Sequence, residues 1–275
     1  MTQQAPKGHV VCLLGLGEAG GSIGRDLIAA GVAVSAWDPD SSRQLLGAVV
    51  ADTLAEAVDA SDIVLSINSA GAALEAAEAA VPSLRAGQLY ADLNSARASL
   101  KREIAEVLAP TGATFADAAL MEGVPRRGLG TRCLVSGPGA AEFASFFGPL
   151  GMPVEVIGSA PGDAAARKLL RSVFAKGLAA AAEEAVRAGE AAHCDVWLRG
   201  EIAGMLAAAD EALLDRLLDG SRRHASRRLR EMEDVSELLR TLEVEPRVTA
   251  SAIAYLHEMA QDRAGAVEEA QSNVV

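Results

Sequence analysis

The first 160 residues alternate short runs of apolar and β-branched residues with longer alanine-rich segments. Strands that alternate with helices in this way form parallel β–α–β units, with helices on both faces of one sheet. We therefore expect an α/β domain over residues 1–160. The runs that predict its strands are HVVCLLG (9–15), VAVSAWD (32–38), DIVLSIN (62–68), GQLYADL (87–93), ATFADAAL (113–120), RCLVSG (132–137) and PVEVIG (153–158).

The pattern changes to purely helical after residue 158. No proline interrupts a helical pattern from Asp163 to about Ala192, and Asp163 is placed to cap its N-terminus. A helix of about thirty residues is about 45 Å long, so it should connect two domains. Further helices are predicted near 197–208, 211–218 and 221–241, and another begins at Pro246. Residues 161–275 are thus predicted to form a spine helix and an all-α domain.

A glycine-rich loop follows the first predicted strand and opens a helix. Its glycines, Gly15, Gly17 and Gly20, have the G-x-G-x-x-G spacing, and Glu18 and Ala19 lie between them. The first glycine permits a tight turn, the second lets the backbone approach a pyrophosphate, and the third lets the helix pack against the strand. The N–H groups that begin the helix can bind the phosphate oxygens. This context predicts a Rossmann-type dinucleotide-binding domain.

Polar residues at the ends of the next strands complete the predicted cofactor site. Asp38 ends the second strand, where a carboxylate can accept hydrogen bonds from the adenosine ribose. Asp38 and its neighbour Asp40 favour NAD because they would repel a 2′-phosphate, although Arg43 leaves NADP possible. Asn68 and Asn94 lie at the carboxyl edge of the sheet, where they would place the nicotinamide and its ribose or, alternatively, cap turns.

Four motifs together resemble the β-hydroxyacid dehydrogenases, a group that includes 3-hydroxyisobutyrate dehydrogenase and relatives of 6-phosphogluconate dehydrogenase. They are GLGEAG from Gly15, DLNSARAS from Asp92, GTRCLVSGP from Gly130, and a lysine early in the long helix. After about Cys194 the chain is similar instead to an uncharacterised helical domain found on some of these proteins. The resemblance implies an NAD(P)-dependent enzyme that oxidises an alcohol, and a homodimer formed through the helical domain.

By the same resemblance Lys168 is the general acid/base, in a K-x-x-x-N pattern whose asparagine is replaced by Ser172. Hydride transfer from an alcohol leaves a hydroxyl proton to be removed, and a partly desolvated lysine can have its pKa lowered to about 7 to 8 for that task. Arginine stays protonated and cannot do this. The chain has only four lysines against twenty-one arginines, which favours a specific need for lysine at 168. The alternative is a solvated helix residue.

The substrate loop departs from the family pattern. Met121 stands at the position of the usual serine, and Glu122 and Gly123 follow it. The change in the loop argues against a small β-hydroxy carboxylate bound in the usual way and favours an apolar or larger substrate. Arg171 and Ser172, one turn beyond Lys168, are expected to contact the substrate.

Further substrate contacts are predicted in the helical part. Lys176 lies two turns beyond Lys168, too far away to act on the same atom. His224 and Arg227 suggest an anion-binding patch that faces the substrate, or else a charged helix face in which the arginine pairs with Glu231.

Composition limits the class of partner. The net charge of −12 and the pI near 4.9 argue against binding to nucleic acid or to anionic membranes, so the predicted partner is a small molecule. Three widely spaced cysteines form neither a disulfide framework nor a metal-ligand cluster, and no apolar run is long enough for a signal peptide or a membrane span. A cytoplasmic protein is expected.

Two other functions remain open. An imine reductase would share this architecture, but such enzymes often lack the lysine, so Lys168 counts against it. A dinucleotide-binding sensor without turnover is suggested by the altered substrate loop.

Overall fold

A computed structural model describes residues 8–69 and 71–272, and it contains each of the seven predicted strands together with a short one, β3, that the sequence pattern did not predict. The strands are β1 (Val10–Leu14), β2 (Ala33–Trp37), β3 (Val49–Val50), β4 (Ile63–Ser66), β5 (Leu89–Asp92), β6 (Thr114–Leu120), β7 (Cys133–Ser136) and β8 (Val154–Gly158).

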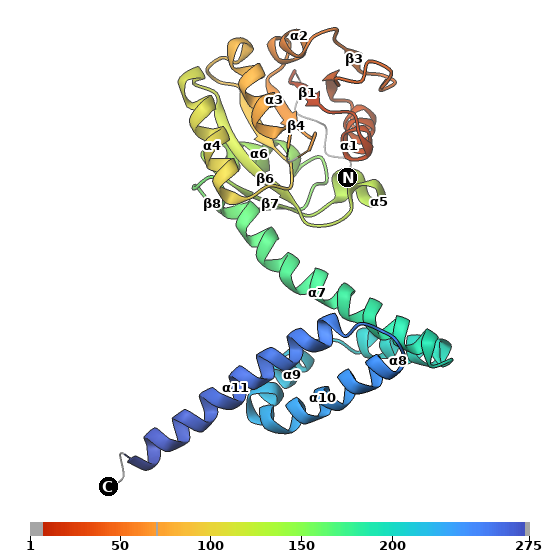
Figure 1. Ribbon diagram of the computed structural model, residues 1–275. Coiled ribbons are helices and arrows are strands. Elements are labelled where there is room, and N and C mark those ends of the chain that lie inside the picture. Colours follow the sequence, from red (N-terminus) through yellow and green to blue (C-terminus); the bar gives the residue numbers. More distant parts are fainter. Residues whose placement is uncertain (1–7, 70, 273–275) are drawn as a thin grey trace. The chain divides into compact units, whose positions relative to one another are not determined.

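These strands form one sheet in the order β3-β2-β1-β4-β5-β6-β7-β8 (Figure 1). All neighbouring pairs are parallel except β6 and β7, which are antiparallel. The expectation of purely parallel units is wrong at this pair. Residues 121–132 between the two strands form only the short helix α5 (Val124–Arg127) and a 3₁₀ turn at Gly128–Gly130, and neither can carry the chain back across the sheet.

Helices cover both faces of this sheet. They are α1 (Glu18–Ala29), α2 (Leu54–Asp59), α3 (Ala73–Ala80), α4 (Ala98–Leu108) and α6 (Ala140–Phe147). Successive side chains of β1 point to opposite faces, so Leu13 packs with Ile23 of α1 and Phe143 of α6, whereas Leu14 packs in the cluster that contains Ile104 of α4. The sheet is therefore buried on both sides, as a parallel sheet requires.

The long predicted helix is α7 (Asp163–Ala191). Asp163 is its first residue and not its cap. The N–H groups of the first turn, which have no partner within the helix, donate instead to side chains of the sheet: Ala164 donates to Ser136 Oγ at 3.1 Å and Ala165 donates to Asp117 Oδ2 at 2.9 Å. A helix start that the sequence assigned to a local cap is thus held by tertiary contacts.

The chain divides into two compact units, Met1–Arg171 and Ser172–Val275, and α7 contributes to both. The second unit also contains α8 (Asp195–Ala207), α9 (Glu211–Arg223), α10 (Ala225–Thr241) and α11 (Arg247–Ser272). The predicted start of a helix at residue 221 is wrong, because α9 continues to Arg223 and the chain breaks at His224. An α/β domain followed by a spine helix and helical region is confirmed, while the boundary between domains 1–160 and 161–275 stays a prediction.

Glu184 of α7 holds the start of α11 within the second unit. Its carboxylate accepts hydrogen bonds from the N–H groups of Val248 at 2.7 Å and Thr249 at 2.9 Å, and from the Thr249 hydroxyl at 2.6 Å. Partial burial would raise the pKa of Glu184, but these hydrogen bonds outweigh it and lower that pKa below its ordinary value. This side chain acts as the N-terminal cap of α11.

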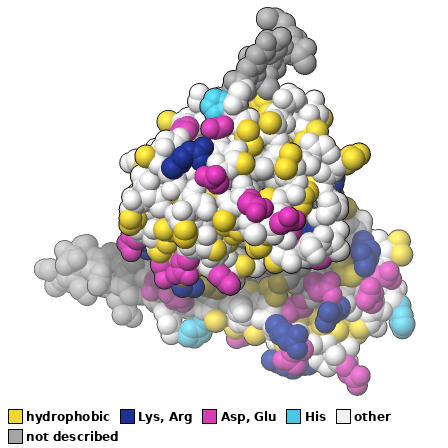
Figure 2. Space-filling model, turned by 90° about the horizontal axis from the view of Figure 1, so that it is seen from above, with side chains coloured by type: hydrophobic (Ala, Val, Ile, Leu, Met, Phe, Trp, Pro, Cys, Tyr) yellow, Lys and Arg dark blue, Asp and Glu magenta, His cyan; other side chains and the backbone are white. Residues whose placement is uncertain are grey.

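The surface carries mixed charge and much exposed apolar area. On the face shown in Figure 2, acidic and basic side chains are interspersed. Within the second unit, Val173, Phe174, Val196 and Trp197 are each at least 63% exposed. No helix among the described residues is long and apolar enough to cross a membrane.

Candidate functional site

The loop after β1 has the backbone that a dinucleotide requires. Gly15 has φ +114°, and a Cβ there would lie 2.3 Å from the carbonyl oxygen of Ile67. A Cβ at Gly20 would lie 2.0 Å from the Gly15 carbonyl oxygen, so both positions need glycine. A Cβ at Gly17 would meet only the tip of Arg43, at 3.3 Å. Gly17 thus leaves the start of α1 open, and no side chain caps the N–H groups of the first turn of this helix. These residues fit a pyrophosphate.

The carboxylate of Asp38 holds this loop. Oδ2 accepts a hydrogen bond from the N–H of Leu16 at 2.6 Å, and Oδ1 accepts one from the N–H of Asp40 at 2.9 Å. The Asp38 side chain is only 7% exposed. Each oxygen retains a second lone pair. Asp38 therefore contacts the glycine loop. Its binding of the ribose stays a prediction.

A cavity of about 480 Å³ opens at this edge of the sheet, between the ends of β1, β2 and β4. Gly15, Gly17, Asp38 and Asn68 line it. Its charged side chains are the carboxylates of Asp38, Asp40 and Glu75 and the guanidinium of Arg43. Arg43 lies 3.5 Å from Asp38 and 3.4 Å from Asp40, so its charge is already paired. Hydrogen bonds from Ser42, assisted by Arg43, lower the pKa of Asp40.

A second cavity, of about 310 Å³, shares Ile67, Asn68 and Ser69 with the first. Ala19, Asn94, Glu122 and Lys168 also line it, with Leu93, Ser95, Leu120 and Val124. Residues predicted to bind cofactor and residues predicted to bind substrate thus meet around one hollow. Of the other residues predicted in the glycine loop, Glu18 is exposed on the first turn of α1 and Gly20 is buried beneath Gly15.

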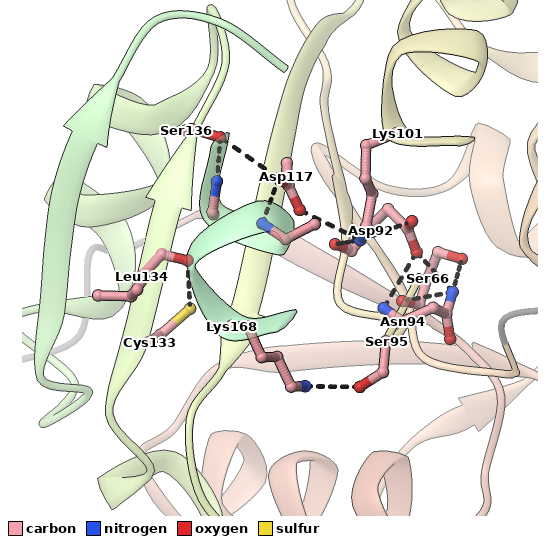
Figure 3. A network of polar contacts seen from close by, with 12 residues as sticks. Ser66, Asp92, Asn94, Ser95, Lys101, Asp117, Cys133, Leu134, Ser136 and Lys168 are labelled. Atoms are coloured by element: carbon pink, nitrogen blue, oxygen red, sulfur yellow. Dashed lines mark hydrogen bonds and ion pairs between the residues drawn. The ribbon is translucent and has the colours of Figure 1, made fainter. Parts of the chain in front are cut away.

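Lys168 reaches this second cavity from the second turn of α7. Its Nζ donates a hydrogen bond to Ser95 Oγ at 2.5 Å, as Figure 3 shows. Ser95 lies in the loop that follows β5, so the contact joins the helix to the sheet edge. The arrangement brings a titratable amine and a hydroxyl to the wall of a hollow beside the glycine loop, which is the geometry that proton transfer to a bound substrate requires.

The amides at the sheet edge form a network of hydrogen bonds. Asn94 Nδ2 lies 2.7 Å from Asn68 Oδ1 and 2.5 Å from Asp92 Oδ1, and Ser66 Oγ donates to Asn68 Oδ1 at 3.1 Å. The network holds the ends of β4 and β5 together. Asn68 and Asn94 therefore do more than cap turns, while their contact with a nicotinamide stays a prediction.

A buried lysine lies behind this network, and sequence reasoning gave it no role. Nζ of Lys101, on α4, is 2.8 Å from Asp92 Oδ2, 3.2 Å from Asp117 Oδ1 and 2.8 Å from the Asp92 carbonyl oxygen (Figure 3). The three side chains are 0% exposed. A signal was available, because Lys101 shares the apolar face of its helix with Ile104 and Leu108 in a chain that uses few lysines.

The buried thiol of Cys133, on β7, stays protonated at neutral pH. Burial, and secondarily the charge of Asp117, raises the pKa of Cys133 to about 12, although Lys168 and Lys101 act in the opposite sense. Among the described residues, no three His, Cys, Asp or Glu side chains come together to hold a metal ion.

The altered substrate loop divides its side chains between core and cavity. Met121 is buried against Ala119, Leu134 and Ala164, and its carbonyl oxygen accepts a hydrogen bond from Arg171 at 2.9 Å. Glu122 lines the cavity of Lys168 and pairs with Arg127 at 2.7 Å. Gly123 lies at the start of α5. The position that holds a serine in the resembling family thus contributes core packing here.

The remaining predicted substrate residues belong to the second unit. Ser172 and Lys176 continue α7, and Lys176 is exposed. His224 lies at the break between α9 and α10, where its carbonyl oxygen accepts hydrogen bonds from the N–H groups of Arg227 at 3.1 Å and Arg228 at 3.0 Å. Arg227 pairs with Glu231 at 2.7 Å on an exposed surface. Substrate contact by these four residues stays a prediction.

The fold and the glycine loop define a dinucleotide-binding domain joined to a helical unit. Residues 10–158 match the model of the NAD binding domain of 6-phosphogluconate dehydrogenase, and residues 190–259 match a domain of unknown function, DUF1932. The chain belongs to the family of proteins with this 6-phosphogluconate dehydrogenase NAD binding domain. Membership confirms the predicted resemblance and the nicotinamide dinucleotide cofactor, and it places the chain among NAD(P)-dependent dehydrogenases and reductases.

Solved structures with the same fold cover nearly the whole chain. The conserved protein MTH1747, described as of unknown function with similarity to 3-hydroxyacid dehydrogenases, is 27% identical, with 92% of this chain and 98% of that chain covered and a TM-score of 0.60. An imine reductase from Myxococcus stipitatus in complex with NADP+ is 18% identical, with 92% and 94% covered and a TM-score of 0.81. A variant of the Myxococcus stipitatus enzyme in complex with NAD+ is also 18% identical, with 93% and 94% covered and a TM-score of 0.78. A search of the curated proteins found no match.

Proposed function

We propose that the protein is an NAD-dependent oxidoreductase that interconverts an alcohol and its carbonyl compound, with Lys168 as general acid/base. The observation that carries this proposal is the Lys168–Ser95 hydrogen bond of 2.5 Å in a hollow that shares Asn68 with the dinucleotide cavity. A substrate in that hollow would lie beside a cofactor in the neighbouring one. The substrate class is a β-hydroxy acid or a related compound of larger or more apolar character, because Met121 packs in the core and does not supply the hydroxyl that the serine of the family offers to a carboxylate.

The chain's own residues divide the work. Lys168 Nζ takes the proton from the substrate hydroxyl in oxidation and returns it to the carbonyl oxygen in reduction. Ser95 Oγ fixes the direction of the amine. Asn68 and Asn94 hold the sheet edge at the junction of the two cavities, and the glycine loop binds the pyrophosphate. When bound, the cofactor supplies hydride acceptance and donation.

Charge supports NAD over NADP. Three carboxylates, Asp38, Asp40 and Glu75, line the dinucleotide cavity against one guanidinium, that of Arg43. A 2′-phosphate would add negative charge to a cavity that is already negative. Arg43 could bind that phosphate only by leaving Asp38 and Asp40, so NADP is the weaker cofactor in this proposal.

An imine reductase is the second candidate, and Glu122 favours it. This carboxylate lines the same cavity as Lys168 and pairs through one oxygen with Arg127 at 2.7 Å, so its other oxygen is the group that would attract a protonated amine or iminium group. The likeness in fold to imine reductases is compatible with either activity. A sensor that binds the dinucleotide without turnover remains the third candidate.

The second unit is proposed to form a homodimer. Val173 and Phe174 of α7 and Val196 and Trp197 of α8 are at least 63% exposed, and apolar groups of this size favour burial against a partner. A second copy of the chain is the partner that the family resemblance implies. The cytoplasmic location stays a prediction from the cysteine pattern.

The experiment is a paired screen. Binding of NAD+ and NADP+ is measured by calorimetry, and turnover is followed at 340 nm with β-hydroxy acids, apolar alcohols and cyclic imines. Lys168→Ala should lose on the order of 10² to 10⁴-fold in turnover of the alcohol while keeping its affinity for NAD+. Turnover of imines alone would select the second candidate. Cofactor binding without any turnover would select the sensor, and an undiminished Lys168→Ala would refute the assignment of the base.

A further inference from the structure

The Lys101 cluster, defined as Lys101, Asp92 and Asp117, joins two segments that carry the proposed catalytic groups. Asp92 ends β5, and Ser95 follows three residues later. Asp117, on the adjacent strand β6, is the direct partner of Asp92. Two carboxylates in this register on neighbouring strands repel each other unless a cation lies between them. Lys101 supplies that cation.

The ammonium group is matched to its surroundings. It has three N–H donors, and three oxygens lie within 3.2 Å of it, two from Asp92 and one from Asp117. Asp92 Oδ2 and Asp117 Oδ1 have no hydrogen-bond partner among the described residues, so their ion pairs with Lys101 are the contacts that compensate their burial. Loss of Lys101 would leave two buried carboxylates facing each other, which is strongly unfavourable.

The second carboxylate oxygen of each aspartate accepts hydrogen bonds from the segments that carry Ser95 and Lys168. Asp92 Oδ1 accepts hydrogen bonds from the backbone N–H of Asn94 at 3.2 Å and from its side-chain amide at 2.5 Å, which fixes the loop that carries Ser95. Asp117 Oδ2 accepts from the N–H of Ala165 at 2.9 Å, which fixes the first turn of the helix that carries Lys168. The contacts form a ring that closes through the Lys168–Ser95 hydrogen bond (Figure 3).

We infer that Lys101 is a positioning residue for the active site: it holds Asp92 and Asp117 so that Ser95 and Lys168 are kept at hydrogen-bond distance. This role rests on the proposed function of Lys168. Lys101 itself is fully buried and touches neither cavity wall, so it acts through the two aspartates. A cluster that served only the stability of the sheet would not need to contact both the Ser95 loop and the first turn of α7.

The small number of lysines makes this role measurable without a known substrate. Protein labelled with ¹³C at lysine Cε has four lysine signals, and Lys168→Ala identifies that of Lys168. In Lys101→Met the Lys168 signal should move, because its contact with Ser95 is altered. Arg102→Met removes an exposed cation from the next position of α4 and should leave the signal in place.

The double variant Lys101→Met with Asp92→Asn guards against simple unfolding. It loses one positive and one negative charge, so the net charge of the cluster is the same as in wild type. If neither Lys101 variant folds, Asp92→Asn alone breaks the same ring while keeping the ammonium. In any folded variant turnover should fall on the order of 10²-fold, and the affinity for NAD+ should fall less than turnover.

The two ways to fail are separate. A Lys168 signal that stays in place in every folded variant of the cluster would overturn the positioning role, whatever Lys168→Ala does to turnover. Full turnover in Lys168→Ala would overturn the proposed function, whatever the Lys101 variants show. A moved signal, with turnover lowered more than the affinity for NAD+, would support the inference.

Discussion

Lys168 and Ser95 lie 73 positions apart in the sequence, and their side chains meet at 2.5 Å. Ser95 stands just beyond the end of β5, while Lys168 stands on the second turn of α7. The contact depends on the start of α7 being held against β6 and β7 by Asp117 and Ser136. The proposed base is therefore oriented by residues from several strands.

Replacement of Ser95 tests this orientation. Ser95→Ala removes the acceptor of the Lys168 hydrogen bond, and we expect kcat to fall about 10- to 100-fold, since hydrogen bonds to charged groups contribute about 1.5 to 3 kcal/mol. NAD+ affinity should be unchanged. Ser99→Ala, an exposed serine that contacts Arg97, is the matched control. Steady-state kinetics measure both variants, and wild-type kcat in Ser95→Ala would contradict the role of the hydroxyl.

The glycine loop can be tested by added methyl groups. Gly17→Ala should fold normally but bind NAD+ at least about tenfold more weakly, because its Cβ has room in the fold and yet enters the space of the pyrophosphate. Gly15→Ala should destabilise the α/β unit, since its Cβ would lie 2.3 Å from the Ile67 carbonyl oxygen. Gly177→Ala on α7, where a Cβ meets nothing within 4 Å, is the control. Calorimetry and thermal unfolding separate the effects, and normal NAD+ affinity in Gly17→Ala would refute the site.

Cofactor choice should respond to Asp40. Hydrogen bonds from Ser42 and the charge of Arg43 lower its pKa, so Asp40 is ionised at neutral pH and repels a 2′-phosphate. Asp40→Asn should narrow the preference for NAD+ over NADP+ by about tenfold, because it removes a negative charge and leaves Arg43 paired only with Asp38. Asp52→Asn, exposed outside the cavity, should leave the preference unchanged. Tighter binding of NADP+ than of NAD+ by the wild type would reverse the assignment.

The helical unit should lose stability with Glu184→Gln in a pH-dependent way. The pKa of Glu184 in the folded protein is lowered from the ordinary value of 4.5. The contribution of Glu184 to the free energy of unfolding is therefore fully present above pH 4.5 and is lost as the pH falls through the folded-state pKa. The variant should be less stable by about 1 kcal/mol at pH 7, and the difference should vanish in acid. Fluorescence of Trp197 in a Trp37→Phe background reports on this unit. Glu183→Gln, whose carboxylate pairs only with Arg187 among the described residues, is the control. A difference that persists at low pH would refute the cap.

Local sequence signals predicted the strands, the glycine loop and the long helix. Apolar runs with β-branched residues marked each longer strand, and Gly15 and Gly20 stood where backbone crowding excludes other residues. The two-residue strand β3 was missed because Val49 and Val50 are too short a run to differ from a loop. The antiparallel pairing of β7 was missed because hydrophobic pattern sets the face of a strand and not its direction.

The site was predicted in part. Lys168, Asn68, Asn94 and Glu122 do line one cavity, and each stood next to a strand end or a helix start that the sequence marked. The burial of Met121 was not predicted, because it depends on Ala119, Leu134 and Ala164, which come together only in the folded sheet. Lys101 was missed because a lysine on a helix is ordinarily solvated, and only two aspartates from separate strands make its burial favourable.

The sequence by itself determined the longer strands, the dinucleotide loop and the long helix, because these depend on local backbone preference, spacing and side-chain chemistry. The role of Lys168 in proton transfer stays a proposal. Tertiary structure decided that Asp117 rather than Asp163 holds the start of α7, and that Lys101 lies between two carboxylates. Such contacts join residues from different strands and helices. Their energy depends on burial and exact register, which exist only once the sheet has formed.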